Sequence, residues 1–324
     1  MPRGRLALTS VLGAAGAALL IWQIRDVGAD NVATGLASVG WGFLAILLLA
    51  FLRFLARAAA WHALLAEPVR LGRAVAAVIA GDALGKTPLT LLISEPAKAL
   101  YLGNPSGPGR ALAALTAENF FYAISIGIYI ALGAVAFLTF DLSQTPMIAA
   151  LTTLSLVLFG LAFAAWLARA QPSVASGLLA KLPIRRLAVV VDRLRRFERQ
   201  AYDYAAGQPD RIRRVILALT SFHLLSFLEA WLTVGLLTGE SLPLQAFVLD
   251  SFSRIINVVF NAIPLRLGVD QYGAKEFATA IGLHETTGFN LSLIRTVRQL
   301  VFMVVGVALL AFRSPAGPRV LSKS

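Results

Sequence analysis

The first candidate for chemistry is Gly85-Lys86-Thr87, because these residue types in this order end a phosphate-binding loop. In the motif G-x-x-x-x-G-K-[ST], an earlier glycine lets backbone amides wrap the phosphates. Ala80 stands where that glycine is required, and Pro88 removes a backbone donor where the helix should begin. The spacing therefore argues against a nucleotide site and leaves Lys86 as a cation in an apolar run.

A larger set of polar side chains lies within or beside long apolar stretches. A charge at the centre of a bilayer costs about 2.5–3.5 kcal/mol on insertion scales, so such residues usually pair with one another or line a pathway. We predict that they line a substrate-binding site. The candidates are Arg53, Arg57, Lys86, Glu95, Lys98, Glu118, Asn119, Glu229, Asp250, Arg254, Asn257, Asn261, Arg266, Asp270, Arg295 and Arg298.

Each candidate also has a structural interpretation. Arg53 and Arg57 are four residues apart and share a helix face. They are predicted either to clamp a phosphate or to pair with Glu118 and Glu229, and we favour an ion pair for at least one of them. The two glutamates could instead relay protons.

The residues of the two broken segments allow similar alternatives. Glu95 could cap or position a half-helix, whereas Lys98 could extend to the membrane interface. Arg295 and Arg298 could reach Asp270 or Glu276, for binding or as a structural latch.

One stripe of residues is the best candidate for a hydrated wall. Asp250, Arg254, Asn257 and Asn261 follow the spacing i, i+4, i+7, i+11, which places them on one face of one helix. The three histidines are scattered without ligand spacing, and no nucleophile motif is present. We therefore expect no metal, no cofactor and no catalytic centre.

The elements that must position these residues are membrane helices. The chain is 58% hydrophobic and 14% charged, against roughly 25% charged in soluble proteins. Several apolar runs reach the length of about 20 residues that crosses a bilayer. The predicted spans are 6–24, 41–65, 111–140, 145–168, 215–237 and 289–312.

Two further apolar segments, 74–100 and 244–282, are interrupted by glycine, proline and charge. We predict that each is a re-entrant helical hairpin. The fold class is then an all-α polytopic membrane protein with about six spans and two hairpins. Residues 1–144 and 145–324 form an inverted repeat, an architecture that places a site near the midplane of the membrane.

The distribution of Lys and Arg predicts the orientation of the chain. With both hairpins returning to the side from which they enter, the termini and the loop 169–214 lie in the cytoplasm. This loop holds eleven Lys or Arg and four acidic residues. The segment 184–207 has the pattern of an amphipathic helix on an anionic leaflet, and the alternative is a basic connector packed on the protein's own helices.

Several motifs together resemble one family. They are RAAAWHALL (57–65), Glu95-Pro96-x-Lys98-Ala99, Glu118-Asn119-Phe120-Phe121-Tyr122, Pro264-Leu265-Arg266-Leu267-Gly268, and Arg295 with Arg298. Their order resembles the transmembrane domain of lysylphosphatidylglycerol synthases, a family of flippase-like proteins, in a stand-alone form without the acyltransferase domain. The resemblance implies lipid handling, in some relatives in hopanoid or other specialised pathways, and a bacterial-type cytoplasmic (inner) membrane. Lys86-Thr87 and Arg266 depart from the family pattern that we expect.

The leading hypothesis is a flippase for a lipid with a polar or anionic headgroup. Two alternatives are an intramembrane lipid-modifying enzyme, with Glu118 as the first carboxylate to consider, and a secondary transporter of a small polar solute. A scaffold for a lipid-synthesis complex is a further possibility. The expected partners are membrane lipids and not nucleic acid.

Overall fold

The fold is given by a computed structural model, which describes residues 21–22, 24–25, 28–65, 69–85, 94–103, 108–170, 195–196, 199, 202–203, 209–260, 263 and 266–312. The predicted span 6–24 and the predicted amphipathic segment 184–207 therefore lie almost wholly outside the described residues. Lys86, Pro88, Asn261 and Pro264 lie outside them too.

Within the described ranges the chain forms ten α-helices and no strand. They are α2 (Ala29–Val39), α3 (Gly42–Leu64), α4 (Leu71–Gly85), α5 (Ser94–Leu102), α6 (Pro108–Phe137), α7 (Gln144–Ala170), α10 (Pro209–Thr238), α11 (Pro243–Val259), α12 (Val269–Ala280) and α13 (Glu285–Ala311). The all-α prediction is confirmed for this part of the chain.

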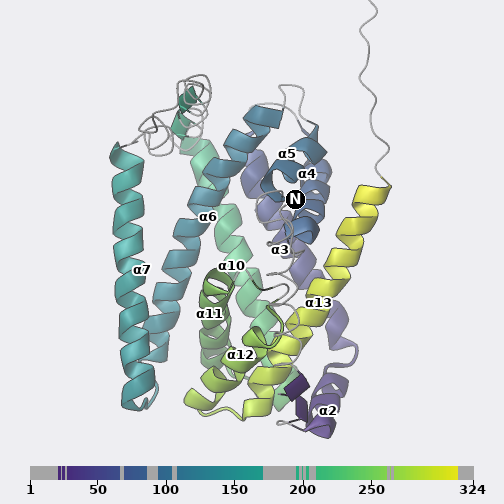
Figure 1. The fold of residues 1–324 in the computed structure, drawn as a ribbon, viewed down its shortest axis with the longest axis vertical. Coiled ribbons are helices and arrows are strands. Elements are labelled where there is room, and N and C mark those ends of the chain that lie inside the picture. Colours follow the sequence, from purple (N-terminus) through teal and green to yellow (C-terminus); the bar gives the residue numbers. More distant parts are fainter. Residues whose placement is uncertain are drawn as a thin grey trace, which may run out of the picture.

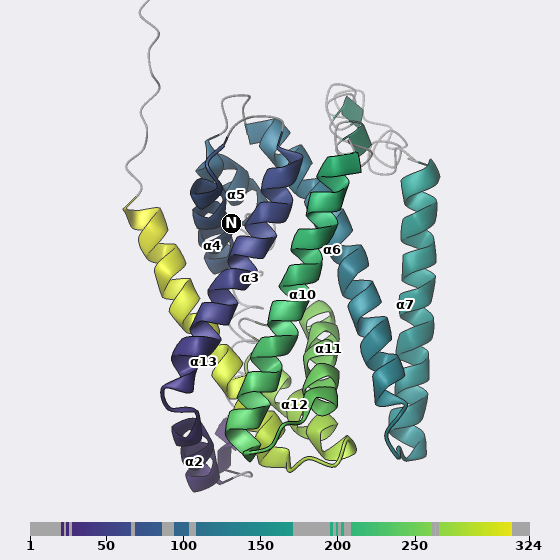
Figure 2. The same ribbon diagram turned by 180° about the vertical axis from the view of Figure 1, so that it is seen from behind.

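Five helices are long and apolar enough to cross a membrane, namely α3, α6, α7, α10 and α13. Their bounds match the predicted spans other than the first to within a few residues at most ends, although α10 begins earlier than expected. They run roughly side by side along the long axis of the molecule (Figures 1 and 2). The match arises because apolar length is the main requirement for crossing a bilayer.

The connection 25–40 contains a helix that the sequence did not predict. The eleven residues of α2 are too few to cross a membrane. This helix packs against α10 and α13 at one end of the molecule. Gly35 lies against Asn290 of α13, whose amide donates a hydrogen bond to the carbonyl of Asn31.

The two predicted broken segments each form a pair of short helices. Helices α4 and α5 pack together at one end of the long helices, and α11 and α12 pack together toward the other end (Figures 1 and 2). In each pair the two helices pack closely at a glycine. Gly81 of α4 lies against Lys98 of α5, and Gly273 of α12 lies against Ile256 of α11. The absence of a β-carbon allows the helices of each pair to approach closely.

The long helices surround these pairs in a regular way. Helices α3 and α10 pack on each other along their length, α4 packs on α3 and α13, and α11 packs on α10 and α6. Helix α5 packs on α6, and α12 packs on α13. The first pair shares an apolar core around the fully buried Trp61, and the second shares one around Phe137.

Helix α13 contacts both pairs through glycines. A β-carbon at Gly288 would collide with the carbonyl group of Ala274 in α12. A β-carbon at Gly306 would lie 2.7 Å from the carbonyl oxygen of Ile79 in α4. Both positions require the backbones to be in direct contact, which only a residue without a side chain permits.

Candidate functional site

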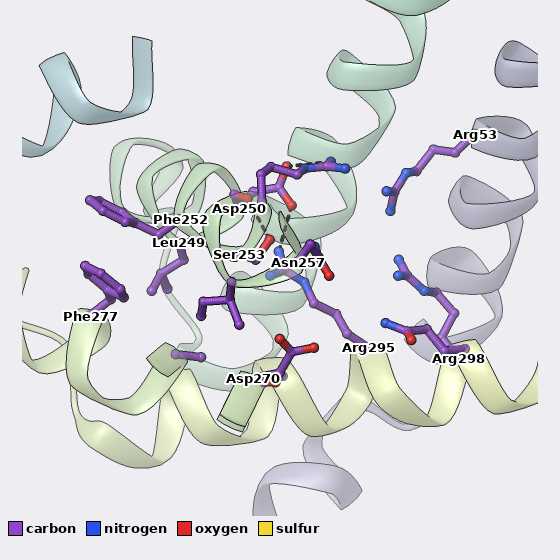
Figure 3. A pocket seen from close by; sticks show the side chains of 15 residues that line it. Arg53, Leu249, Asp250, Phe252, Ser253, Asn257, Asp270, Phe277, Arg295 and Arg298 are labelled. Atoms are coloured by element: carbon purple, nitrogen blue, oxygen red, sulfur yellow. Dashed lines mark hydrogen bonds and ion pairs between the residues drawn. The ribbon is translucent and has the colours of Figure 1, made fainter. Parts of the chain in front are cut away.

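A small polar cavity lies among α3, α11, α12 and α13 (Figure 3). Its volume is about 50 Å³, which is room for a few water molecules. We call it the cationic cavity, after the four arginines in its lining. Its polar lining consists of Arg53, Asp250, Ser253, Arg254, Asn257, Asp270, Ser292, Arg295, Arg298 and Gln299.

Asp250 of α11 is the first centre of contacts in this cavity. Its carboxylate is 3% exposed and accepts hydrogen bonds from Tyr129 of α6 at 2.8 Å and Arg295 of α13 at 2.9 Å. Arg254, one turn further along α11, donates to the same carboxylate at 3.3 Å and also to Ser226 of α10. One buried carboxylate therefore joins three helices.

Glu229 of α10 is the second centre. It is 2% exposed, accepts a hydrogen bond from Arg53 of α3 at 2.8 Å, and is also bound by Arg298 of α13. Arg53 and Arg298, which both face the cavity in Figure 3, bind different oxygens of this glutamate, Oε2 and Oε1, so Glu229 keeps one partner if either arginine is lost.

Positive charge exceeds negative charge around the cationic cavity. Four guanidinium groups face the carboxylates of Asp250 and Glu229, while Arg266 and Asp270 form a separate ion pair at 3.1 Å. Asp82 of α4 adds one further negative charge within electrostatic reach of Arg298, which still leaves an excess of cations. The cavity is therefore suited to an anion.

Several polar atoms of the cavity are buried without a hydrogen-bond partner among the described residues. Two are guanidinium Nε donors, on Arg53 and Arg254, and two are acceptors, Oδ1 of Asp270 and Oε1 of Gln299. Buried polar groups in native proteins are almost always satisfied by protein, water or ligand. These atoms therefore mark positions for water or a polar ligand.

A second group of charges lies at the other pair of short helices, and we call it the paired cluster. Arg57 donates to Glu118 at 2.5 and 3.1 Å and to Asn119 at 2.6 Å. The amide of Asn119 donates to Glu95 at 3.0 Å, and Glu95 accepts from Lys98 at 2.6 Å. The two cations and two carboxylates of this cluster balance one another.

An aromatic layer separates the two groups of charges. The guanidinium of Arg57 lies 3.4 Å from the ring centroid of Tyr122, which packs edge-on against Phe222 at 5.4 Å. The guanidinium groups of Arg53 and Arg254 lie 4.9 and 5.4 Å from the ring centroid of Phe222. Cation–π contacts stabilise desolvated guanidinium groups, so these rings hold the arginines in place.

The structure brings most of the predicted residues into one of these two groups. Arg53, Asp250, Arg254, Asn257, Asp270, Arg295 and Arg298 line the cationic cavity, and Glu229 and Arg266 bind members of it. Arg57, Glu95, Lys98, Glu118 and Asn119 form the paired cluster. Lys86 and Asn261 lie outside the described residues, and substrate binding by any of these residues stays a prediction.

The structure changes two local expectations and confirms a third. Arg295 and Arg298 form their direct ion pairs with Asp250 and Glu229, and Arg295 keeps Asp270 only within electrostatic reach. Lys98 is 8% exposed and bound to Glu95, so it does not extend to the interface. Both Arg53 and Arg57 form ion pairs, where we favoured at least one.

Sequence reasoning missed some residues of the site. Tyr129 binds Asp250, Ser226 binds Arg254, and Gln299 lines the cationic cavity. A signal for Tyr129 was present, because it is eleven residues after Glu118 and therefore on the same face of α6. Neutral polar residues cost little in an apolar helix, which makes the other two hard to identify.

The helices and the charged site define a polytopic membrane protein with a polar interior. A family model described as the lysylphosphatidylglycerol synthase TM region matches residues 6–306, and the chain belongs to this family. No curated protein and no solved structure matches the chain significantly. Membership of this family makes the chain a membrane protein and is consistent with a lipid-related role.

Proposed function

We propose that the protein is a lipid transporter of the flippase type, which moves a lipid with an anionic or polar headgroup across the membrane. The cationic cavity is the observation that carries this proposal, because it holds an excess of buried arginines inside a helical membrane protein of a lipid-related family. Burying an unpaired charge is costly, and an anionic ligand would offset that cost.

Arginine suits a lipid phosphate in particular. Its planar guanidinium forms two parallel hydrogen bonds to phosphate oxygens, and it stays charged when buried. The Nε donors of Arg53 and Arg254, which have no hydrogen-bond partner in the part of the chain that the structure describes, would suit such contacts. The free acceptors on Asp270 and Gln299 would suit a headgroup that also carries hydroxyl or ammonium donors.

The arrangement of the helices supports a route through the membrane. If α3 exchanges with α10, α4 with α11, α5 with α12 and α6 with α13, each contact among these eight helices becomes a contact among the same eight. Thus the packing of α4 on α13 corresponds to the packing of α11 on α6, and the packing of α5 on α6 corresponds to that of α12 on α13. This regularity favours an inverted repeat of 1–144 and 145–324, with α4–α5 and α11–α12 as re-entrant hairpins from opposite faces.

The orientation follows from the charges in the connections. We place both termini and the basic loop 169–214 in the cytoplasm of a bacterial-type inner membrane, where segment 184–207 would contact anionic lipid. Helices α4 and α5 then lie at the cytoplasmic side and α11 and α12 at the external side. Cleavage of a protease site inserted into 169–214, from one side of sealed vesicles only, would test this placement.

The decisive experiment is transport of a labelled lipid by the purified protein. Vesicles would contain phosphatidylglycerol with a dithionite-sensitive fluorophore on one chain, and the loss of protected fluorescence would be followed over time. We expect faster exchange between leaflets with the wild type than with empty vesicles, and a slower rate with phosphatidylcholine. Equal rates with and without the protein, for both lipids, would overturn the proposal.

The two rival functions would give different results. A lipid-modifying enzyme would convert the labelled lipid into a product detectable by mass spectrometry, without exchange between leaflets. A solute transporter would leave the lipid unmoved and would accumulate a small polar anion in the vesicles. The site favours a lipid over a small solute, because Arg254 lies 5.7 Å from the ring centroid of Tyr129, which lines an apolar groove.

A further inference from the structure

An apolar groove lies on the outside of the bundle, between α6, α10 and α11. It has a volume of about 590 Å³, within the range of sites for small molecules, which is about 300–1,000 Å³. Its lining consists of Tyr129, Thr220, His223, Leu224, Phe227, Pro243, Leu244 and Phe247. Leu224 and Leu244 are 54% and 44% exposed, so the groove is open to the surroundings of the spanning helices.

The groove runs along the membrane direction. Residues 220–227 occupy the middle of α10, and residues 243–247 begin α11 at the end of the molecule where α10 finishes (Figures 1 and 2). A long apolar chain lying in this groove would extend from one membrane surface toward the middle of the bilayer. It would therefore be parallel to the acyl chains of one leaflet.

One side chain, that of Tyr129, contacts both the groove and the lining of the cationic cavity. The ring of Tyr129 faces the groove, stacked on His223 at 4.7 Å and edge-on to Phe247 at 5.1 Å. Its hydroxyl points the other way and donates to Asp250, which lines the cavity. Arg254 lies over the same ring at 5.7 Å. Tyr129 therefore forms a wall of the groove and binds the lining of the cavity, which makes it the side chain that the two sites share.

His223 provides a second observation at this wall. Its Nε2 is 3.0 Å from Ser125 of α6, but its buried Nδ1 has no hydrogen-bond partner among the described residues. A buried polar atom that faces an apolar groove is costly unless a polar group reaches it. The Ser125 hydroxyl donates to the carbonyl of Tyr122, so Nε2 of His223 donates to Ser125 and Nδ1 is left as an acceptor. A hydroxyl of a lipid headgroup passing between groove and cavity would donate to it.

We infer that the groove and the cavity form one lipid site. An acyl chain lies in the groove, the anionic headgroup enters the cationic cavity beside it, and the Tyr129 side chain must move to connect them. The inference takes the anionic headgroup from the proposed function and adds the position of the chain and the direction of approach. An apolar groove next to buried arginines matches a molecule with both an apolar chain and an anion, and an ordinary membrane lipid has both.

The test is photo-crosslinking of bound lipid, which requires binding and not transport. The protein in nanodiscs would be loaded with phosphatidylglycerol that carries a diazirine near the end of one acyl chain, and labelled residues would be located by mass spectrometry. We expect labelling concentrated on Leu224, Phe227, Leu244 and Phe247. Even labelling over exposed apolar residues such as Phe159 of α7 would overturn the inference.

Two variants and a second lipid make the result specific. Leu224→Trp fills the groove and is expected to lower its labelling about tenfold, as the loss of two or so buried methylene contacts would give. Leu217→Trp, on an equally exposed leucine of the same helix outside the groove, should leave labelling unchanged. Diacylglycerol with the same diazirine chain lacks the anionic headgroup and should label the groove much less. Equal labelling by the two lipids would show that the cavity does not contribute to binding in the groove.

The outcome is separable from that of the transport experiment. Groove labelling without lipid exchange between leaflets would retain the combined site and remove the flippase activity. Lipid exchange with uniform labelling would retain the transporter and remove the groove as the position of the chain.

Discussion

The paired cluster and the cationic cavity use the same residue types with opposite balance. In the paired cluster, Arg57 and Lys98 are matched by Glu118 and Glu95, and Asn119 links the two ion pairs. In the cationic cavity, four arginines face Asp250, Glu229 and, at longer range, Asp82, and two guanidinium Nε atoms have no partner among the described residues. The comparison separates balanced buried charge, which holds helices together, from unbalanced buried charge, which we propose binds a ligand.

The largest expected effect is on stability and concerns Arg57. Arg57→Gln leaves Glu118, which is 1% exposed, without its cationic partner, and breaking a buried pair in this way costs about 3–5 kcal/mol. Thermal unfolding in detergent should show a large fall in Tm or no folded protein. Arg53→Gln is the matched control, one turn away on the same helix, because Glu229 keeps Arg298.

If Arg53→Gln destabilises the protein as much as Arg57→Gln, the distinction between the two groups is wrong. If both variants fold and only Arg53→Gln loses transport, the distinction is sharpened. The double substitution of these arginines by alanine would not separate the roles, since it disrupts both groups at once.

The next effect concerns the link inside the paired cluster. Asn119→Ala removes hydrogen bonds to Arg57 and Glu95 while leaving both ion pairs, and bonds to charged groups contribute about 1.5–3 kcal/mol. We expect a lower Tm with transport per folded molecule unchanged. A folded variant that no longer moves lipid would instead place the paired cluster on the substrate path.

Arg254 gives the sharpest test of the cationic cavity. Arg254→Gln leaves Asp250 bound to Arg295 and Tyr129, so the fold should persist, while exchange of phosphatidylglycerol should fall by at least about tenfold. Arg254→Lys keeps the charge without the guanidinium geometry and should give an intermediate rate. Wild-type transport by the glutamine variant would show that the excess charge is not used for binding.

The smallest effect on stability is expected at Tyr129, the side chain that the groove and the cavity share. Tyr129→Phe removes one hydrogen bond to Asp250, which retains two arginines, and should cost about 1.5 kcal/mol of stability, the low end of the range for bonds to charged groups. The same change at the half-exposed Tyr272 should cost less. Differential scanning fluorimetry of the two variants would measure the difference, and a larger loss at Tyr272 would contradict it.

The sequence allowed the spans and the buried charges to be predicted because both follow from one strong energy term. Water and lipid differ so much as solvents that apolar length and the cost of charge identify α3, α6, α7, α10 and α13, and the residues inside them. The spacing of Asp250, Arg254 and Asn257 correctly placed them on one face, since all three line the cationic cavity.

The partners of these charges could not be predicted in the same way. Helical spacing gives the face on which Arg295 and Arg298 lie, but the packing angle of α13 decides whether Asp250 or Asp270 is within reach. The contact of Tyr129 with Asp250 joins residues 121 positions apart. Such pairs depend on tertiary packing, which local sequence patterns do not encode.

The glycines of α13 have a mechanical consequence. Gly288 and Gly306 are separated by 18 residues, which is about 27 Å along a helix. They hold the backbone against α12 at one end and against α4 at the other, while Arg295 and Arg298 lie near the midpoint. A tilt of this rod about its centre carries α12 and α4 in opposite directions. Arg295 and Arg298 lie at the centre of such a tilt, where the displacement would be smallest.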